Sequence, residues 1–233
     1  MIPTLWRPAG LLAALDDYLS CPAVDRVIVI DNDPSQRPAP AEALAKHPRL
    51  LLLSQPRNLL VNQAWNLGMA QITSSSTLVG ILNDDIHIPS GILMKLLAQA
   101  PPPGTVVGLL PAGDTLTDFA LEPFTYRHGV SIGSQCGGFG SALFLRRSDF
   151  VPIPSRLRIW FGDDWILQHA RRILGLRSTQ IRVDRHVTMT AMRSSYAFRR
   201  QLARDKALAP RLLGWDRPTE TRGRPDTSGR GHG

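Results

Sequence analysis

The chain has 233 residues, 43% of them hydrophobic, which suits one sizeable domain with appendages better than two full domains. No apolar run approaches the length of a membrane span, and Cys21 and Cys136 are too far apart to form a metal-binding pair, so the sequence excludes a membrane-spanning protein and a zinc- or disulfide-stabilised one. The net charge is +8, and residues 193–233 contribute nine Arg and one Lys against three Asp and one Glu. We expect a cytoplasmic protein whose basic end gives it the option of peripheral contact with the inner face of a membrane.

Strand and helix patterns alternate along most of the chain. This alternation predicts an α/β domain, with a mostly parallel, Rossmann-like sheet flanked by helices. Pro3 and Thr4 already resemble the start of a strand-to-helix loop, so the first strand is truncated to a stub or absent. The predicted strands after it are 27–30, 50–53, 78–82, 106–110, one ending at 145, and 181–183. The predicted helices are 8–19, 39–46, 61–71, 90–99, one opening at 160–165 and closing at Gly175, and 194–209.

Two segments do not follow the alternation. Residues 112–137 have little periodicity and are interpreted as an insertion or as acceptor-side loops. Residues 194–233 form a separate unit, a basic helix followed from Pro210 by a disordered tail rich in Gly, Pro, Arg and Thr, so the domain proper covers 1–193.

Acidic and amide side chains directly follow two of the predicted strands. Asn83, Asp84 and Asp85 come after strand 78–82, and Asp31 ends strand 27–30. In an open α/β sheet the ligand crevice lies outside the carboxyl ends of the strands, and carboxylates placed there favour a divalent cation. An ordinary turn that uses Asn and Asp is the alternative.

The order of these motifs resembles that of family 2 glycosyltransferases with the GT-A fold, over about residues 2–194. The run Val-Ile-Val-Ile-Asp31-Asn resembles the family's strand-plus-Asp motif that meets the nucleotide base, and Leu-Asn-Asp-Asp85 resembles its D-x-D metal motif. The segment from Asn58 to Gly68 resembles its two Asn-x-Gly units, with Leu60 where Gly is usual. Gly-Asp163-Asp164-Trp resembles the acidic pair whose second member is the base of inverting members.

The resemblance implies a metal-dependent, inverting enzyme that moves a sugar from a nucleoside diphosphate donor, with UDP or dTDP as the carrier. A divalent cation, Mn²⁺ or Mg²⁺, would stabilise the diphosphate leaving group, and a carboxylate would take the proton of the acceptor. The start of a helix at the acidic pair is expected to keep both carboxylates ionised. The implied site residues are Asp164 and Asp163 for catalysis, Pro3, Thr4, Asp31, Asn58, Asn66, Asn83 and Asp84 for donor binding, and Asp85 and His186 for the metal.

Other functions and other roles for these residues remain open. Asp31 and Asp33 also resemble the nucleophile motif of haloacid-dehalogenase-like phosphatases, although no Lys lies shortly before Asp163. A non-catalytic protein that binds a nucleotide sugar or nucleic acid is a further alternative. His186 alone could equally be a structural histidine, and the acidic pair ordinary helix-start residues. The acceptor is not identified by any motif: a saccharide, a lipid-linked glycan and modified nucleic acid are all compatible with a basic tail.

Overall fold

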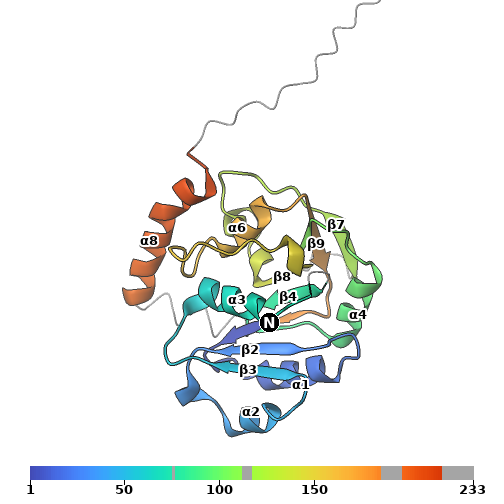
Figure 1. Cartoon of the computed structure of the whole chain (residues 1–233). Helices are drawn as coiled ribbons and strands as arrows, with labels where there is room; N and C mark the ends of the chain where they lie inside the picture. The colour runs from blue at the N-terminus through green and yellow to red at the C-terminus, as the bar shows by residue number, and fades with distance from the viewer. Residues whose placement is uncertain (75–76, 112–116, 185–195, 217–233) are drawn as a thin grey trace, which may run out of the picture.

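The computed structural model describes residues 1–74, 77–111, 117–184 and 196–216 (Figure 1). The strands are β1 Ile2–Thr4, β2 Val27–Asp31, β3 Leu50–Ser54, β4 Leu78–Leu82, β5 Ile86–His87, β6 Thr105–Leu109, β7 Ala120–Pro123, β8 Ala142–Arg146, β9 Arg172–Arg177 and β10 Arg182–Val183. The helices are α1 Leu11–Ser20, α2 Ala39–Leu44, α3 Leu60–Ala70, α4 Ser90–Ala98, α5 Ile132–Gln135, α6 Gly162–Gln168 and α8 Tyr196–Leu213. Short 3₁₀ turns cover Pro34–Gln36, Phe139–Ser141 and Arg147–Asp149.

The three-residue strand β1 joins the two halves of the sheet. On one side it pairs in parallel with β2, which pairs in parallel with β3. On the other side the Met1 ammonium donates to the carbonyl of Gly80 at 2.5 Å, and the amide of Leu82 donates to the carbonyl of Met1 at 3.0 Å. These two bonds follow the pattern of a parallel pair, so β4 runs alongside β1 in the same direction. The predicted stub is therefore a real strand.

The second half of the sheet is mixed, in the order β4-β8-β6-β9-β7. Strand β8 runs antiparallel to both of its neighbours, β4 and β6, whereas β9 runs parallel to β6 and β7 antiparallel to β9. Strands β1, β2, β3, β4, β6 and β9 consequently all point the same way. Their carboxyl ends form a single edge, which is where an α/β sheet binds its ligands.

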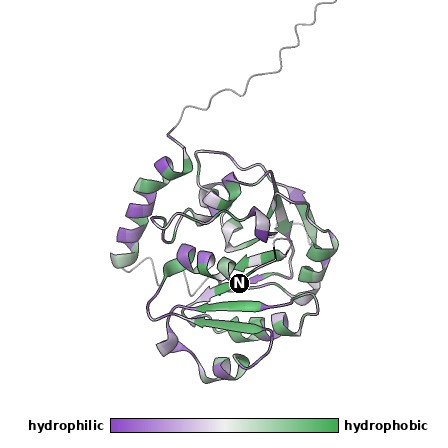
Figure 2. Ribbon diagram, in the orientation of Figure 1, coloured by the Kyte–Doolittle hydropathy of each residue, from purple (hydrophilic) through white to green (hydrophobic). Residues whose placement is uncertain are grey.

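Alternate side chains of the strands pack into hydrophobic clusters on opposite faces of the sheet. On one face, α1 and α4 pack against residues such as Phe144 of β8 and Leu82 of β4. On the other face, α3 and α6 pack against Leu143 and Leu145 of β8 and Ile81 of β4. Figure 2 shows β2 and β3 as continuously hydrophobic ribbons, as expected for strands that are covered on both faces.

Two predicted stretches are different in the structure. The helix expected to close at Gly175 ends at Gln168, and the residues that follow it form β9. Ile173 faces one core while Leu174 and Leu176 face the other, which is the period of a strand, so the prediction of a continuous helix was wrong. The aperiodic segment 112–137 contains β7 and the short α5 in its described part.

Helix α8 packs beside α6 on the second face (Figure 1). Phe198, Ala209 and Leu213 are buried, and the helix continues through Pro210, where the sequence predicted disorder to begin. Burial of Ala209 and Leu213 on either side of Pro210 explains the continuation, because tertiary packing outweighs the missing backbone donor. None of the described helices combines the length and the apolar character that a membrane crossing requires.

Candidate functional site

Hydrogen bonds tie the tips of β1, β2 and β4 together at the carboxyl edge. Thr4, which ends β1, is buried; its hydroxyl donates to Asp84 Oδ2 at 2.8 Å and accepts from the amide of Trp6 at 2.8 Å. The carbonyl of Thr4 accepts from the amide of Asn32, the residue after β2, at 2.9 Å. Pro3 lies within β1, opposite Ile30. The predicted donor-binding residues Thr4 and Asp84 are therefore in direct contact, although 80 residues separate them in sequence.

The Asn83–Asp85 motif has the electrostatic character of a cation site. Burial, with a smaller contribution from the neighbouring negative charge of Asp85, raises the pKa of Asp84 to about 6, although the hydrogen bond from Thr4 opposes the shift. Two adjacent carboxylates of this kind are hard oxygen donors, which suit Mg²⁺ or Mn²⁺. The part of the chain that the structure describes contains no group of three potential ligands. His186, the second predicted ligand, lies outside the described residues, but the amide of Asp184 donates to the carbonyl of Asp85 at 2.7 Å.

The second acidic pair is connected to the same edge through the glycine-rich segment before β8. The amide of Asn83 donates to the carbonyl of Ser141 at 2.9 Å. The preceding residue, Gly140, lies against Asp163, because an ideal Cβ built on Gly140 would be 2.2 Å from Asp163 Oδ2. Ser141 therefore contacts the motif after β4 and its neighbour Gly140 contacts the start of α6, so these two residues connect the two acidic pairs.

Asp164 is the deeper member of the pair, 2% exposed. Its Oδ1 accepts hydrogen bonds from the hydroxyl of Tyr126 at 2.9 Å and from the amide of Ile132 at 2.7 Å. Burial, followed by the charge of Asp163, raises the pKa of Asp164 to about 7. The pKa of Asp163 is also raised by burial, although its Oδ1 accepts from the amide of Asp164 at 3.0 Å. The expectation that the helix start lowers the pKa of both groups was therefore wrong: desolvation outweighs the dipole of this seven-residue helix and raises both pKa values.

Strained backbone accompanies the predicted site segments. Trp6, Leu60 and Phe161 have φ angles of 60°, 64° and 64°, in the left-handed region that non-glycine residues rarely adopt. They lie next to Thr4, Asn58 and the acidic pair, respectively. Such strain persists only where surrounding contacts enforce it, and it is concentrated at functional sites.

The three asparagines of the 58–66 segment have different roles. The side chain of Asn58 accepts from the amide of Leu60 at 2.7 Å and so caps the turn into α3. Asn66 pairs through both ends of its amide with the backbone of Ile153, at 2.8 and 2.9 Å. Donor binding by Asn58 and Asn66 remains a prediction, because these contacts show only local structural roles.

Asn62, which the sequence analysis did not select, is the asparagine that touches the acidic helix. It is completely buried, and its amide nitrogen donates to the carbonyl of Trp160 at 3.2 Å. An ideal Cβ on Gly162 would be 2.2 Å from Asn62 Oδ1, so the glycine before the acidic pair is required for this contact. The spacing of four residues between Asn62 and Asn66 was the available signal, because it places both side chains near one face of the helix.

Asp31 is enclosed by partners at the tip of β2. Its side chain is 0% exposed; Oδ2 accepts from Arg37 at 2.6 and 2.8 Å, and Oδ1 accepts from the amide of Asp33 at 3.1 Å. The same guanidinium donates to the hydroxyl of Ser54 at the tip of β3. Asp31 thus fixes the loop after β2 through Arg37, a residue that no sequence motif had indicated, and its contact with a nucleotide base remains a prediction.

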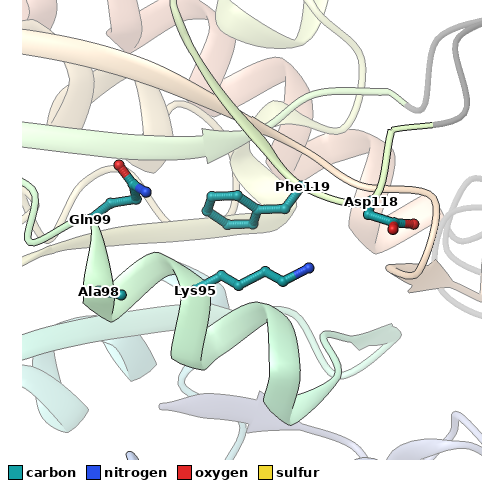
Figure 3. A pocket seen from close by; sticks show the side chains of 5 residues that line it. All are labelled: Lys95, Ala98, Gln99, Asp118 and Phe119. Atoms are coloured by element: carbon teal, nitrogen blue, oxygen red, sulfur yellow. The ribbon is translucent and has the colours of Figure 1, made fainter.

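A cavity of about 400 Å³ lies between α4 and the segment before β7 (Figure 3). Figure 3 shows the Phe119 ring over α4, with the Lys95 side chain extending from the helix toward Asp118. It is lined by Lys95, Ala98, Gln99, Asp118 and Phe119. None of these belongs to the predicted site, so the cavity does not bear on the acidic groups at the carboxyl edge.

Comparison with solved structures identifies this architecture. The crystal structure of S. aureus TarS 1–349 aligns with a TM-score of 0.53 and 14% identity, covering 76% of this chain and 59% of that one. The same TarS fragment in complex with UDP aligns with a TM-score of 0.55 and 14% identity, over 75% and 56% of the two chains. The chain therefore spans a little over half the length of TarS 1–349. No protein-family model and no curated protein matches its sequence. The structural likeness confirms the predicted fold class, an α/β domain of the GT-A type.

Proposed function

We propose that this GT-A-type domain is a glycosyltransferase that moves a sugar from a nucleoside diphosphate donor, UDP- or dTDP-linked, to an acceptor hydroxyl. The observation on which the proposal rests is the meeting of two acidic pairs at one sheet edge, through the contacts of Asn83 with Ser141 and of Gly140 with Asp163. Sugar transfer needs both kinds of group at one place, one for the leaving diphosphate and one for the acceptor proton. The UDP complex of TarS, which has the same fold, supports the choice of donor.

The tip of β4 is the proposed diphosphate end of the site. Asp85 and His186 would hold a divalent cation, Mn²⁺ or Mg²⁺, which when bound would neutralise the charge that develops on the diphosphate. Asp84, fixed by the hydroxyl of Thr4, would orient the ribose or a water molecule of the ion. Asn83, Asp31, Pro3, Asn58 and Asn66 would complete the donor pocket.

Asp164 is the proposed base, with Asp163 in support. A carboxylate whose pKa is about 7 is suited to proton transfer near neutral pH, because it is substantially ionised and still basic enough to accept the acceptor proton. Tyr126 and the amide of Ile132 hold one oxygen of Asp164, and the second oxygen would receive the proton. Asp163 lies against Gly140, whose neighbour Ser141 accepts the hydrogen bond from Asn83 at the tip of β4.

A thermal-shift panel of UDP, dTDP, GDP and ADP, each with and without Mn²⁺, tests the donor half of the proposal. We expect stabilisation by UDP or dTDP that requires the metal, and loss of that stabilisation in Asp85→Asn. Turnover of the matching nucleotide sugar should then fall by at least a hundredfold in Asp164→Asn, while nucleotide binding is retained. Stabilisation by no nucleotide at all would refute the proposal.

The alternative functions differ in these measurements. A non-catalytic nucleotide-sugar binder would show the thermal shift but no turnover in the unsubstituted protein. A phosphatase that uses Asp31 as its nucleophile is disfavoured, because the carboxylate is buried and bonded to Arg37. Hydrolysis of an aryl phosphate in the presence of Mg²⁺ would reverse that conclusion.

A further inference from the structure

Three arginines line a groove between α8 and the loop that leads into α6. The groove has a volume of about 430 Å³ and is lined by Arg156, Arg158, Gln201, Arg204, Ala207 and Leu208. All three arginines are exposed, and none forms an ion pair with any residue in the described parts of the chain. Unneutralised guanidinium groups that converge on one hollow favour a ligand with several negative charges, above all phosphates.

The outer side of α8 extends this charge along a line. Tyr196, Arg200 and Arg204 follow one another at intervals of four residues, so they lie on one stripe of the helix. Over its whole length α8 has four Arg and one Lys against the single acid Asp205. The basic residues run from Arg199 to Arg211, a distance of about 18 Å at 1.5 Å per residue. A ligand that matches the full stripe is an extended polyanion instead of a single small phosphate.

The hydrophobic side of α8 is not available to a lipid bilayer. Phe198, Ala209 and Leu213 are buried, and Leu208 and Leu212 pack into the core beneath the helix. An amphipathic helix that binds a membrane inserts its apolar face, and here the protein itself covers that face. The large side chain exposed at the end of the stripe is Tyr196, at 73%. An exposed aromatic ring beside arginines is the arrangement on which nucleic-acid bases stack.

Asp205 links α8 to the loop that leads into the acidic helix α6. Its completely buried carboxylate accepts from three successive amides, those of Arg158, Ile159 and Trp160, at 2.9–3.3 Å. The groove wall at Arg158 is therefore fixed to α8. Four residues of chain separate Arg158 from Asp163, so their Cα atoms are at most about 18 Å apart. A polymer bound along α8 thus lies within a short distance of the proposed base.

We infer that the groove between α8 and residues 156–158 binds the phosphate backbone of a nucleic acid, which presents the acceptor hydroxyl to the site. That the bound nucleic acid is the acceptor rests on the proposed transferase function. That the groove binds a nucleic acid does not depend on it. The arginines contact phosphates, and Tyr196 stacks on an unpaired base. The groove sets the position of the strand and carries no base-specific contacts.

Fluorescence anisotropy with labelled single-stranded and duplex DNA over a series of salt concentrations tests this inference. We expect the triple variant Arg156→Gln/Arg158→Gln/Arg204→Gln to bind at least tenfold more weakly, with a slope of log K against log salt that is smaller by roughly 2 to 3. The matched control is Arg26→Gln/Lys46→Gln/Arg172→Gln, which removes the same charge from exposed positions at the amino ends of β2, β3 and β9. The control should bind as the unsubstituted protein does.

Further arms separate the possible outcomes. Equal losses in the two triple variants, or no DNA binding by the unsubstituted protein, would overturn the inference. The inference would also be overturned if the protein bound vesicles of anionic phospholipid and the groove variant lost this binding but kept its binding to DNA. Tyr196→Ala should weaken single-strand binding about tenfold and Tyr196→Phe should not; equal binding by the two variants would overturn the assignment of Tyr196 as a stacking residue. The thermal shift that UDP induces, measured in both triple variants, tests the transferase proposal independently of DNA binding.

Discussion

Gly140 lies directly against the carboxylate of Asp163, with no room between them for a methyl group. An ideal Cβ on Gly140 would be 2.2 Å from Asp163 Oδ2 and 2.8 Å from both Asp163 Cβ and Cγ. Gly140→Ala must therefore displace the side chain of Asp163. We expect a loss of roughly tenfold to a hundredfold in kcat, because a shift of about 1 Å in a catalytic group has an effect of that size.

Gly91→Ala is the control for this substitution. Gly91 lies in α4, and an added Cβ there would meet nothing within 4 Å. It should leave activity unchanged and raise the free energy of unfolding by roughly 0.5–1 kcal/mol, because alanine is the better helix former. Full activity of Gly140→Ala in a steady-state assay would remove Asp163 from the site.

Asp164→Asn is expected to stabilise the protein at alkaline pH. Asn keeps an oxygen for Tyr126 and the amide of Ile132 but removes a charge that burial disfavours. Because the pKa of Asp164 is raised from 3.8 in the unfolded chain to about 7 in the folded one, its contribution to stability is fully present below about pH 4 and is lost as the pH rises through 7. At pH 8 the free energy of unfolding of the variant should be roughly 2–4 kcal/mol higher than that of the unsubstituted protein.

Urea unfolding of both proteins at pH 4, 6 and 8 measures this difference. The two denaturation curves should approach each other as the pH falls toward 4, because the difference that this carboxyl group causes disappears below its unfolded-state pKa of 3.8. A variant that is less stable at pH 8 would show that Asp164 is held by favourable interactions of its ionised form, contrary to the raised pKa.

The same pKa predicts the pH profile of activity. If Asp164 takes the acceptor proton, kcat/KM should increase with pH up to about 7 and then level off, because only the ionised carboxylate accepts a proton. Asp163→Asn removes the neighbouring charge that raises the pKa of Asp164, so the midpoint should shift to lower pH. A midpoint unaffected by Asp163→Asn would point to a different titrating group.

Leu60→Gly is expected to be tolerated far better than the neighbouring substitution Leu59→Gly. Leu60 has φ = 64°, which glycine adopts freely, whereas Leu59 has φ = −75°. Relief of strain of about 1 kcal/mol should offset the loss of the partly buried Leu60 side chain, while Leu59→Gly has no such gain. Thermal unfolding compares the two, and equal destabilisation would show that Leu60 is not strained.

Arg37→Ala should lower the free energy of unfolding by roughly 3 kcal/mol, because it leaves the buried carboxylate of Asp31 without its cation. Adding Asp31→Asn to it should restore part of the loss, since the uncompensated charge is then removed. Chemical denaturation of the two variants tests this. If the double variant is no more stable than Arg37→Ala, Arg37 acts through packing instead of charge.

The element order could be predicted from the sequence because each part of it depends on local pattern. The apolar runs at 27–30, 50–53 and 78–82 correspond to β2, β3 and β4, and acids follow the first and the third of them at the expected positions. The chain from 168 to 177 could not be assigned in this way. Its apolar residues suit either a helix or a strand, and only the two cores on opposite faces of the sheet make the residues from Arg172 onward a strand.

The sequence by itself determined the fold class and the acids at the strand ends, because hydrophobic period and short motifs are properties of neighbouring residues. Only the tertiary structure decided the partners of those acids: Thr4 for Asp84, Arg37 for Asp31, and Tyr126 with the amide of Ile132 for Asp164. It also showed that burial, and not the helix start, controls the pKa of Asp164. These contacts join residues that are far apart in the chain or in irregular loops, and desolvation depends on everything that packs around a group, so neither is encoded in a local pattern.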